Sequence, residues 1–266
     1  MVKLLSSIQN PEIKKFRLLF QKARERKKQN LFVIEGEREI EKALKGGYLL
    51  ESIFIHEAAE NSFDTLISQS EVSDIFLLAS SIFNRLSVRS GSEKILAIAQ
   101  SKTHELVELT LSKTSLILVI EAPEKPGNIG ALYRTAAAAK MDAVIIANPK
   151  TDFYNPNSIR SSLGSLFLIP TAIGTSKEVI ALLDKKSIRL ATAVINPEAI
   201  YYNDFDYAPP CAIVMGTEST GLDELWLKKT DQHLIIPMAK NVDSLNLSVS
   251  AGILMYEAQR KNNRFE

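Results

Sequence analysis

Six short apolar runs in the second half of the chain constrain its fold most strongly. They are rich in Leu, Ile and Val, and segments with helical periodicity separate them. The runs are LILVI (116–120), AVIIA (143–147), SLFLIP (165–170), IRLATAV (188–194), CAIVMG (211–216) and HLIIP (233–237). Continuous apolar strands alternating with helices indicate a parallel sheet covered on both faces. Ligands of such sheets lie beyond the carboxyl ends of the strands, so we expect the site in the turns there.

The first part of the chain has its own alternation of strands and helices. The apolar runs NLFVIEG, LLESIFI, DIFLLA and EKILAIAQ surround the helical stretch EREIEKALKGG, whose Gly46-Gly47 reads as a helix stop. This pattern predicts a compact α/β unit over roughly residues 30–100. We therefore predict a first domain at 1–100, a polar linker at 101–114 and a second domain at 115–266.

Composition excludes several classes of protein. With 266 residues and 45% hydrophobic content, the chain can bury a large core. No apolar run approaches the roughly 20 residues of a membrane span, and the first residues lack the apolar segment of a secretory signal, so we expect a cytoplasmic protein. The single Cys211 excludes an internal disulfide framework. The three histidines, His56, His104 and His233, lack metal-ligand spacing, so no metal is expected.

Charge is concentrated at the start of the chain. The net charge is +1, yet residues 1–30 hold nine Lys and Arg against two Glu, a local charge of +7. Such a cluster is typical of contact with a polyanion, because Lys and Arg release counterions from phosphates. It is also compatible with an ordinary solvated helix face, and charge counting leaves both interpretations open.

Three turns after predicted strands are unusual. They contain KPGNIGALYRTAAAAK (125–140), GTESTGL (216–222) and IPMAKNVDSLNLSVS (236–250). The stretch GNIG is not the dinucleotide fingerprint, GTESTGL lacks the Lys of a P-loop, and Ser219 lies one place too late for a nucleophile elbow. A Rossmann dehydrogenase, a P-loop NTPase and a serine hydrolase are therefore disfavoured.

Together these stretches resemble the SpoU (TrmH-type) RNA 2′-O-ribose methyltransferases of the SPOUT class. PGNIGALYRTA is similar to the first motif of that family, GTESTGL to the second and IPMAKNVDSLNLSVSAGILMYEAQR to the third, in the right order. The segment DFYNPNSIRSSLGSLFLIP is similar to an intermediate segment of the family. The resemblance covers the chain from about residue 115 to its end, and residues 1–100 resemble the family's substrate-binding domain, which is ribosomal-protein-like.

The resemblance implies more than the patterns do. It implies a deep trefoil knot in the C-terminal domain, a homodimer formed through the knotted region, and S-adenosylmethionine as cofactor. The implied cofactor-binding residues, several acting through their main chain, are Met215, Gly216, Thr217, Gly221, Ile236, Pro237, Met238 and Leu245. The predicted RNA contacts are Lys22, Arg24, Arg26 and Lys27 of the basic first segment, together with Arg160.

The resemblance also implies the catalytic residues Asn128, Arg134, Glu218, Ser244 and Asn246. A guanidinium stays protonated at ordinary pH, so we interpret Arg134 as a ligand of RNA phosphate and developing oxyanion charge rather than as a base. Asn128 and Arg134 are separated by about 9 Å along a helix axis, which favours different roles. The competing interpretations are a surface salt bridge for Arg134 and helix caps for Asn128 and Ser244.

Three residues depart from the family pattern, and the substrate stays open. Lys140, Ser219 and Lys240 stand where the family often has Gly, which puts local turn geometry in doubt. Three functions remain: a ribosomal RNA methyltransferase, a tRNA methyltransferase, and a non-catalytic RNA-binding or ribosome-assembly protein of the same fold. The separate first domain favours ribosomal RNA, and the retained catalytic residues favour an enzyme.

Overall fold

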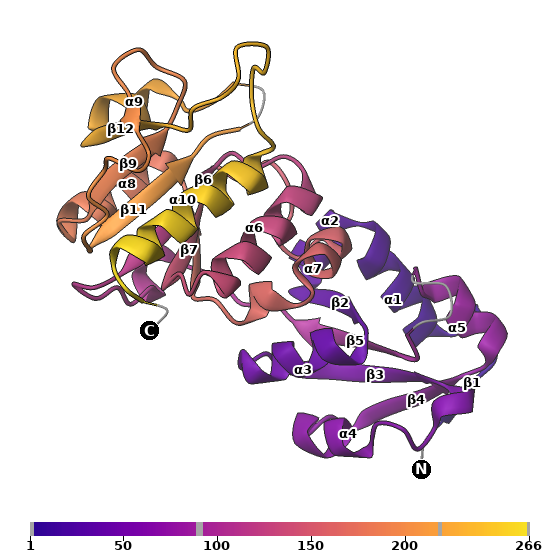
Figure 1. Cartoon of the computed structure of the whole chain (residues 1–266). Coiled ribbons are helices and arrows are strands. Elements are labelled where there is room, and N and C mark those ends of the chain that lie inside the picture. The colour runs from indigo at the N-terminus through magenta and orange to yellow at the C-terminus, as the bar shows by residue number, and fades with distance from the viewer. Residues whose placement is uncertain (1–2, 89–92, 218–219, 265–266) are drawn as a thin grey trace. The chain divides into compact units, whose positions relative to one another are not determined.

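The computed structural model describes residues 3–88, 93–217 and 220–264, which form two compact units (Figure 1). The first unit comprises Met1–Thr103 together with Tyr154–Leu168. The second comprises His104–Phe153 and Ile169–Glu266. Each unit has one β-sheet and its own helices, so the predicted α/β class is confirmed.

A five-stranded mixed sheet forms the centre of the first unit, in the order β1-β4-β3-β5-β2. Its strands are β1 (Lys3–Leu5), β2 (Leu31–Glu35), β3 (Leu50–His56), β4 (Asp74–Leu78) and β5 (Ile95–Gln100). Its helices are α1 (Pro11–Gln21), α2 (Ala23–Gln29), α3 (Glu37–Lys45), α4 (Asp64–Ser70), α5 (Ser80–Leu86) and α7 (Pro156–Ser162), with short 3₁₀ turns η1 (Glu57–Ala59) and η3 (Ser165–Phe167). The four predicted strands and the helix stop at Gly46 are confirmed. The three-residue strand β1 was too short to show a pattern.

The basic segment at the start of the chain folds into α1 and α2. The Asn10 side chain caps α1 by accepting a hydrogen bond from the Glu12 N–H at 2.9 Å, and Pro11 takes the first helical position. Lys22 is extended and separates the two helices. Lys22, Arg24 and Lys27 are exposed, as a surface that binds RNA requires.

Arg26 differs from its neighbours because it is only 3% exposed. Its Nη1 donates to the carbonyl oxygens of Leu19 at 2.6 Å and Phe20 at 3.1 Å. These carbonyls belong to the last turn of α1, where C=O groups have no hydrogen-bond donor within the helix. The Arg26 guanidinium therefore holds α1 against α2 from inside the unit, and we leave it out of the RNA-binding surface that the sequence predicted.

A seven-stranded sheet forms the centre of the second unit, in the order β10-β12-β9-β11-β6-β7-β8, and all its neighbouring strands are parallel. Its strands are β6 (Leu116–Glu121), β7 (Ala143–Ala147), β8 (Thr171–Gly174), β9 (Arg189–Ala193), β10 (Ile200–Tyr201), β11 (Cys211–Met215) and β12 (Gln232–Ile235). Its helices are α6 (Pro126–Ala138), α8 (Ser176–Lys185), α9 (Glu224–Lys229) and α10 (Leu247–Lys261), with the 3₁₀ turn η2 (Leu106–Glu108). The predicted parallel sheet is confirmed.

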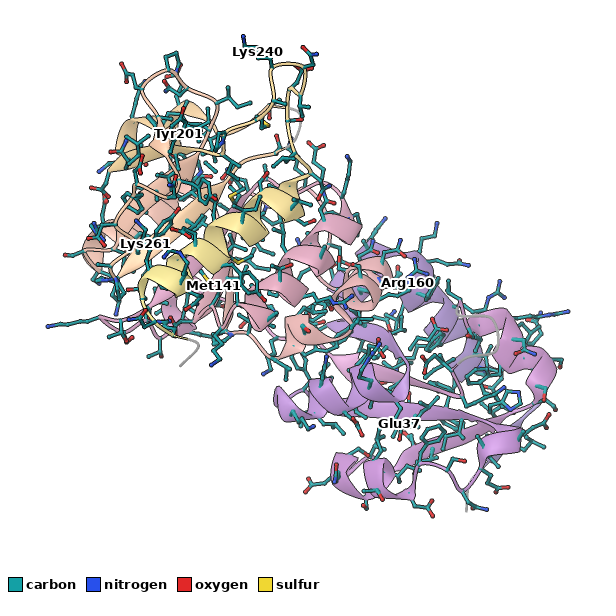
Figure 2. All side chains as sticks on the ribbon, in the orientation of Figure 1. Glu37, Met141, Arg160, Tyr201, Lys240 and Lys261 are labelled. Atoms are coloured by element: carbon teal, nitrogen blue, oxygen red, sulfur yellow. The ribbon has the colours of Figure 1, made fainter. Side chains whose placement is uncertain are left out.

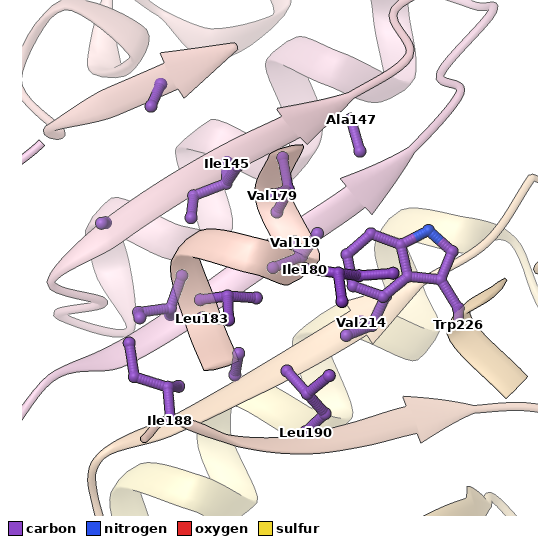
Figure 3. Packing of buried hydrophobic residues seen from close by; sticks show 14 of the residues in the cluster. Val119, Ile145, Ala147, Val179, Ile180, Leu183, Ile188, Leu190, Val214 and Trp226 are labelled. Atoms are coloured by element: carbon purple, nitrogen blue, oxygen red, sulfur yellow. The ribbon is translucent and has the colours of Figure 1, made fainter. Parts of the chain in front are cut away.

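Helices cover both faces of this sheet. On one face, Val119 and Val214 pack with Leu183 of α8 and Trp226 of α9 in one buried cluster (Figure 3). On the opposite face, α6 and α10 lie side by side (Figure 1). Burial on both faces explains why the strands read as unbroken apolar runs instead of alternating with polar residues.

The predicted strand at 165–170 is wrong. This run forms η3 and an irregular segment, and the strand β8 begins afterwards at Thr171. Gly164, at φ +75°, turns the chain, and Phe167 then packs into an aromatic group of the first unit, with its ring 5.7 Å from Phe32 and 5.0 Å from Tyr48. A short apolar run shows only that its residues are buried, and here a turn buries them.

Within the described residues, the structure contains no helix with the length and apolar character that crossing a membrane requires.

We predict that Arg26→Ala destabilises the protein by about 2 kcal/mol, because it removes charged hydrogen bonds to one buried and one half-buried carbonyl. Arg24→Ala, two residues away and exposed, is the matched control and should change stability by less than about 0.5 kcal/mol. Urea denaturation followed by circular dichroism measures both. Equal stabilities of the two variants would contradict the structural role of Arg26.

Candidate active site

A cavity of about 460 Å³ lies beyond the carboxyl ends of β9, β11 and β12, which are neighbours in the second sheet. The segments after these strands and the start of α10 form its walls. None of the described lining residues carries a charged side chain. The volume falls in the range of about 300–1,000 Å³ of small-molecule sites. The cavity therefore fits a ligand that is recognised through apolar contacts and fixed polar groups of the main chain.

The turn after β11 forms one wall and depends on two glycines for different reasons. A Cβ at Gly216 would lie 2.4 Å from the carbonyl carbon of Gly221 and 2.7 Å from the nitrogen of Leu222, so no side chain fits there. Gly221 has open space around it but lies at φ +68°, a conformation that favours glycine. Thr217 and Gly221 exchange two main-chain hydrogen bonds of 3.1 Å. The crowding at Gly216 therefore comes from the main chain of the turn itself.

The segment between β12 and α10 forms the opposite wall. A turn closed by the Val242 N–H and the Ala239 carbonyl places Lys240 at the exposed tip of this segment (Figure 2). Ser244 and Leu245 then line the cavity. Asn246 caps α10 by accepting from the Ser248 N–H at 3.0 Å and the Ser248 hydroxyl at 2.6 Å. Asn246 is therefore the N-cap of α10, and the interpretation of Ser244 as a helix cap is wrong.

Asn128 and Arg134 lie on α6 and do not line the cavity. Asn128 is half-buried in the first turn of the helix, whereas Arg134 is exposed. Six residues rotate a helix by about 600°, so the two side chains leave it in different directions. Arg134 has no hydrogen-bond or ion-pair partner among the residues that the structure describes. The expected salt bridge is therefore not formed with any of these residues, and α6 carries no side-chain cap at its start.

The structure gathers most of the predicted cofactor-binding residues around one cavity. Its lining includes Met215, Gly216, Thr217, Gly221, Ile236, Met238, Ser244 and Leu245, but not Pro237. Glu218 and Ser219 lie outside the described residues. Among the predicted RNA contacts, Arg160 is exposed on α7 (Figure 2), and its guanidinium donates to Asn157 at 2.7 Å. The roles of all these residues remain predictions.

Sequence reasoning missed the third wall of the cavity. Ala193 at the end of β9, the following residues 194–196, Leu222 just before α9 and Leu227 on α9 also line it. The rule that ligands bind beyond carboxyl ends applies to the strand at 188–194 as much as to the others, and it was the signal that could have found this wall. The following stretch INPEA carries no glycine turn or motif that would single it out.

Lys140, which stands where the family often has Gly, adopts the left-handed backbone conformation that favours glycine, with φ +48°. Its Nζ donates to the Arg264 carbonyl at 3.3 Å, and its own carbonyl accepts from Gln259 at 3.1 Å.

Burial raises the pKa of the Cys211 thiol to about 12, so this cysteine stays protonated and is no nucleophile. The described residues contain no cluster of metal-ligating side chains.

Two solved structures that are similar to this chain over nearly its whole length are named as RNA or rRNA methyltransferases. The crystal structure of an RNA 2′-O ribose methyltransferase is 36% identical, with a TM-score of 0.83, over 98% of this chain and 99% of that one. An AdoMet-bound rRNA methyltransferase from Sinorhizobium meliloti shares the fold, with a TM-score of 0.89 and 23% identity over 97% of this chain and 98% of that one. The class is therefore that of the RNA methyltransferases.

Sequence comparison then gives the family. Residues 115–256 match the SpoU rRNA Methylase family, and residues 10–97 match the MRM3-like substrate binding domain. The 23S rRNA (guanosine(2553)-2′-O)-methyltransferase RlmP of Bacillus subtilis (strain 168) is 30% identical over 258 residues, which cover 96% of this chain and 98% of that protein. The chain belongs to the SpoU rRNA methylase family, and the resemblance of its motifs is confirmed.

We predict that Gly216→Ala destabilises the protein more than Gly221→Ala. The first variant forces main-chain atoms of the turn apart, at a cost of about 2–3 kcal/mol. The second adds only left-handed backbone strain, at about 1 kcal/mol. Chemical denaturation measures both free energies of unfolding.

Gly127→Ala on α6 is the matched control for these variants. A Cβ at Gly127 meets no atom within 4 Å, so this change should be neutral or stabilise by up to about 1 kcal/mol. If Gly216→Ala were as stable as Gly221→Ala, the crowded contact between residues 216 and 221 would not limit the turn.

Proposed function

We propose that this protein is an S-adenosylmethionine-dependent methyltransferase that methylates a ribose 2′-hydroxyl of ribosomal RNA. The observation that carries the proposal is the cavity, lined by apolar and uncharged polar side chains among the described residues, where the second and third motifs meet inside a SpoU methylase domain. The substrate-binding domain and the exposed cations of α2 support an RNA substrate. The match to RlmP over nearly its whole length, first domain included, favours ribosomal RNA over tRNA.

The cavity has the chemistry that the adenosine part of S-adenosylmethionine needs. Val194, Leu222 and Leu247 supply apolar surface for a flat ring, and Asn196, Thr217 and Ser244 supply uncharged polar groups. We assign the main chain of Gly216, Ile236 and Leu245 to adenosine recognition, with Met215, Thr217, Gly221, Pro237 and Met238 forming the rest of the cofactor site. When bound, this cofactor supplies an electrophilic methyl group on a sulfonium.

The residues of α6 and the nearby loops then align the RNA. The exposed Arg134 guanidinium would hold a phosphate of the target and stabilise the negative charge that the 2′-oxygen gains as it loses its proton. Asn128 orients the hydroxyl through its amide, and the hydroxyl proton passes to solvent. We assign Glu218 to a bond with Asn128 or Arg134. Ser244 and Asn246 keep the start of α10 in place, since the Asn246 oxygen is engaged by Ser248.

We further propose a deep trefoil knot and a homodimer formed through the second unit. The exposed Val249 and Tyr256 of α10 support the dimer, because they leave apolar surface uncovered on the helix beside α6. The activity belongs in the cytoplasm, with its ribosomal RNA substrate. The domain boundaries at residues 100 and 115 are also part of this proposal.

Methyl transfer is the direct test. With isotope-labelled S-adenosylmethionine and unmodified ribosomal RNA, the protein should place label on a ribose 2′-oxygen, as mass spectrometry of nucleosides will identify. Arg134→Ala should lower this transfer by a factor on the order of 10²–10³, the scale of losing one transition-state donor. Cofactor affinity should stay nearly unchanged, because Arg134 does not line the cavity.

Arg134→Lys separates charge from geometry, since Lys keeps the charge but loses the planar fork. If Arg134→Lys turned over nearly as fast as the wild type, the mechanism would not require a bidentate contact between residue 134 and the RNA. Normal turnover in the Ala variant would remove Arg134 from the mechanism, and no transfer to any RNA by the wild-type protein would refute the proposed function.

RNA affinity should fall steeply with salt through the exposed cations of the first unit. Neutralising Lys22, Arg24 and Lys27 together should reduce the slope of log K against log salt by about 0.7–0.9 for each RNA phosphate that the protein no longer neutralises. Filter binding at a series of salt concentrations measures the slope.

The control is an equal loss of charge in the second unit, at the exposed Lys177 and Lys185 of α8 and at Lys186, which directly follows that helix. It should leave the slope unchanged. If both triple variants behaved alike, the start of the chain would be an ordinary solvated surface.

A further inference from the structure

Glu121 is a buried carboxylate for which the proposed mechanism has no use. It is the last residue of β6 and is 5% exposed. No Lys, Arg or His among the described residues forms an ion pair with it. A carboxylate buried without a cation is costly unless hydrogen bonds replace its hydration. The position therefore needs an explanation beyond packing, which an apolar side chain would supply more cheaply.

Three side chains from different segments satisfy this carboxylate. Its Oε2 accepts from the indole Nε1 of Trp226 at 2.8 Å and from the hydroxyl of Ser176 at 2.5 Å, and its Oε1 accepts from the amide of Asn148 at 3.1 Å. The same Asn148 amide also donates to Ser176 at 2.7 Å. Glu121 thus joins the end of β6 to the segments that follow β7, β8 and β11.

Trp226 is the contact that leads to the cavity. It is fully buried on α9, next to Ile180 and Val214 (Figure 3). Leu227, the next residue, and Leu222, just before the helix, both line the cavity. Apolar packing alone lets an indole rotate or slide, whereas a directional bond at Nε1 fixes the ring and with it the helix.

We propose that Glu121 is a positioning residue for cofactor binding, an inference that rests on the proposed function. Through Trp226 it fixes α9, and α9 fixes the wall of the cavity formed by Leu222 and Leu227. Glu121 has no contact with the ligand in this role. Its effect appears in the affinity for S-adenosylmethionine rather than in the rate of methyl transfer at saturating cofactor.

Trp226 is the single tryptophan of the chain, so intrinsic fluorescence reports on this one residue. In the wild-type protein, adding S-adenosylmethionine should change the Trp226 emission in a saturable way, with the same Kd as calorimetry gives. This readout does not depend on turnover or on any RNA.

The decisive variant is Glu121→Gln, which keeps the shape but replaces one acceptor oxygen by a donor. Its Kd for S-adenosylmethionine should rise by about ten-fold, the scale of losing one well-placed buried hydrogen bond. The matched control is Glu124→Gln, three residues later, because Glu124 is exposed and pairs with Lys150 at 2.7 Å. This control should bind as the wild type does.

A second pair of variants separates positioning from general stability. Trp226→Phe removes the hydrogen-bond donor but keeps an aromatic ring, and it should also raise the Kd for S-adenosylmethionine. The double variant with Glu121→Gln and Trp226→Phe should show no further rise in Kd, because both changes break the same interaction. Leu183→Ala, in the same buried cluster but on α8, should lower thermal stability while leaving Kd within about two-fold of wild type.

The outcomes are distinct. If the wild-type protein does not bind S-adenosylmethionine, the proposed function fails. If it binds, but Glu121→Gln or Trp226→Phe binds as tightly as Glu124→Gln, the positioning role fails alone. If Leu183→Ala weakens binding as much as they do, the effect is one of stability and the role is again refuted. Should Glu121→Gln not fold, Trp226→Phe alone decides between these results.

Discussion

The parallel ladder that pairs β11 with β6 on one side and with β9 on the other determines where everything else in the second unit lies. In this register Met215 is level with both Ile120 and Ala193. The next residues along the three strands are Gly216, Glu121 and Val194. The crowded glycine turn, the buried carboxylate and the third wall of the cavity therefore emerge from the sheet at one level, although up to 95 residues separate them in the sequence.

Much of this architecture is visible in the sequence, and its limits have physical causes. Continuous apolar runs predict strands well where a sheet is buried on both faces, as β6, β7, β9 and β11 are. The same signal failed at 165–170, because burial of Phe167 in an aromatic group also selects apolar residues. The two-residue strand β10 has too few residues for any periodicity, and tertiary pairing with β12 alone creates it.

The sequence predicted the turns that line the candidate site but not the buried charged residues that hold the surrounding elements in place. Glycines and small polar residues after strands pointed to the segments around 216 and 245, which the structure brings to one cavity. Charged residues were harder to interpret, because a sequence does not say which charges are buried. Arg26 reads as one more cation of a basic segment, and Glu121 as the polar end of a strand. Only the fold shows that main-chain carbonyls hold the first and that a tryptophan, a serine and an asparagine hold the second.

The cavity also has a consequence for how this unit folds. Its walls come from segments near residues 194, 216, 236 and 245, and they meet only after strands far apart in the sequence have paired. Contacts of such high order form slowly, because loop-closure entropy is lost before any contact compensates for it. The binding site is complete only when these strands have paired, so a ligand that occupies it stabilises the whole sheet by mass action rather than one loop. Cofactor supply would then govern how long the folded enzyme lasts in the cell as well as how fast it works.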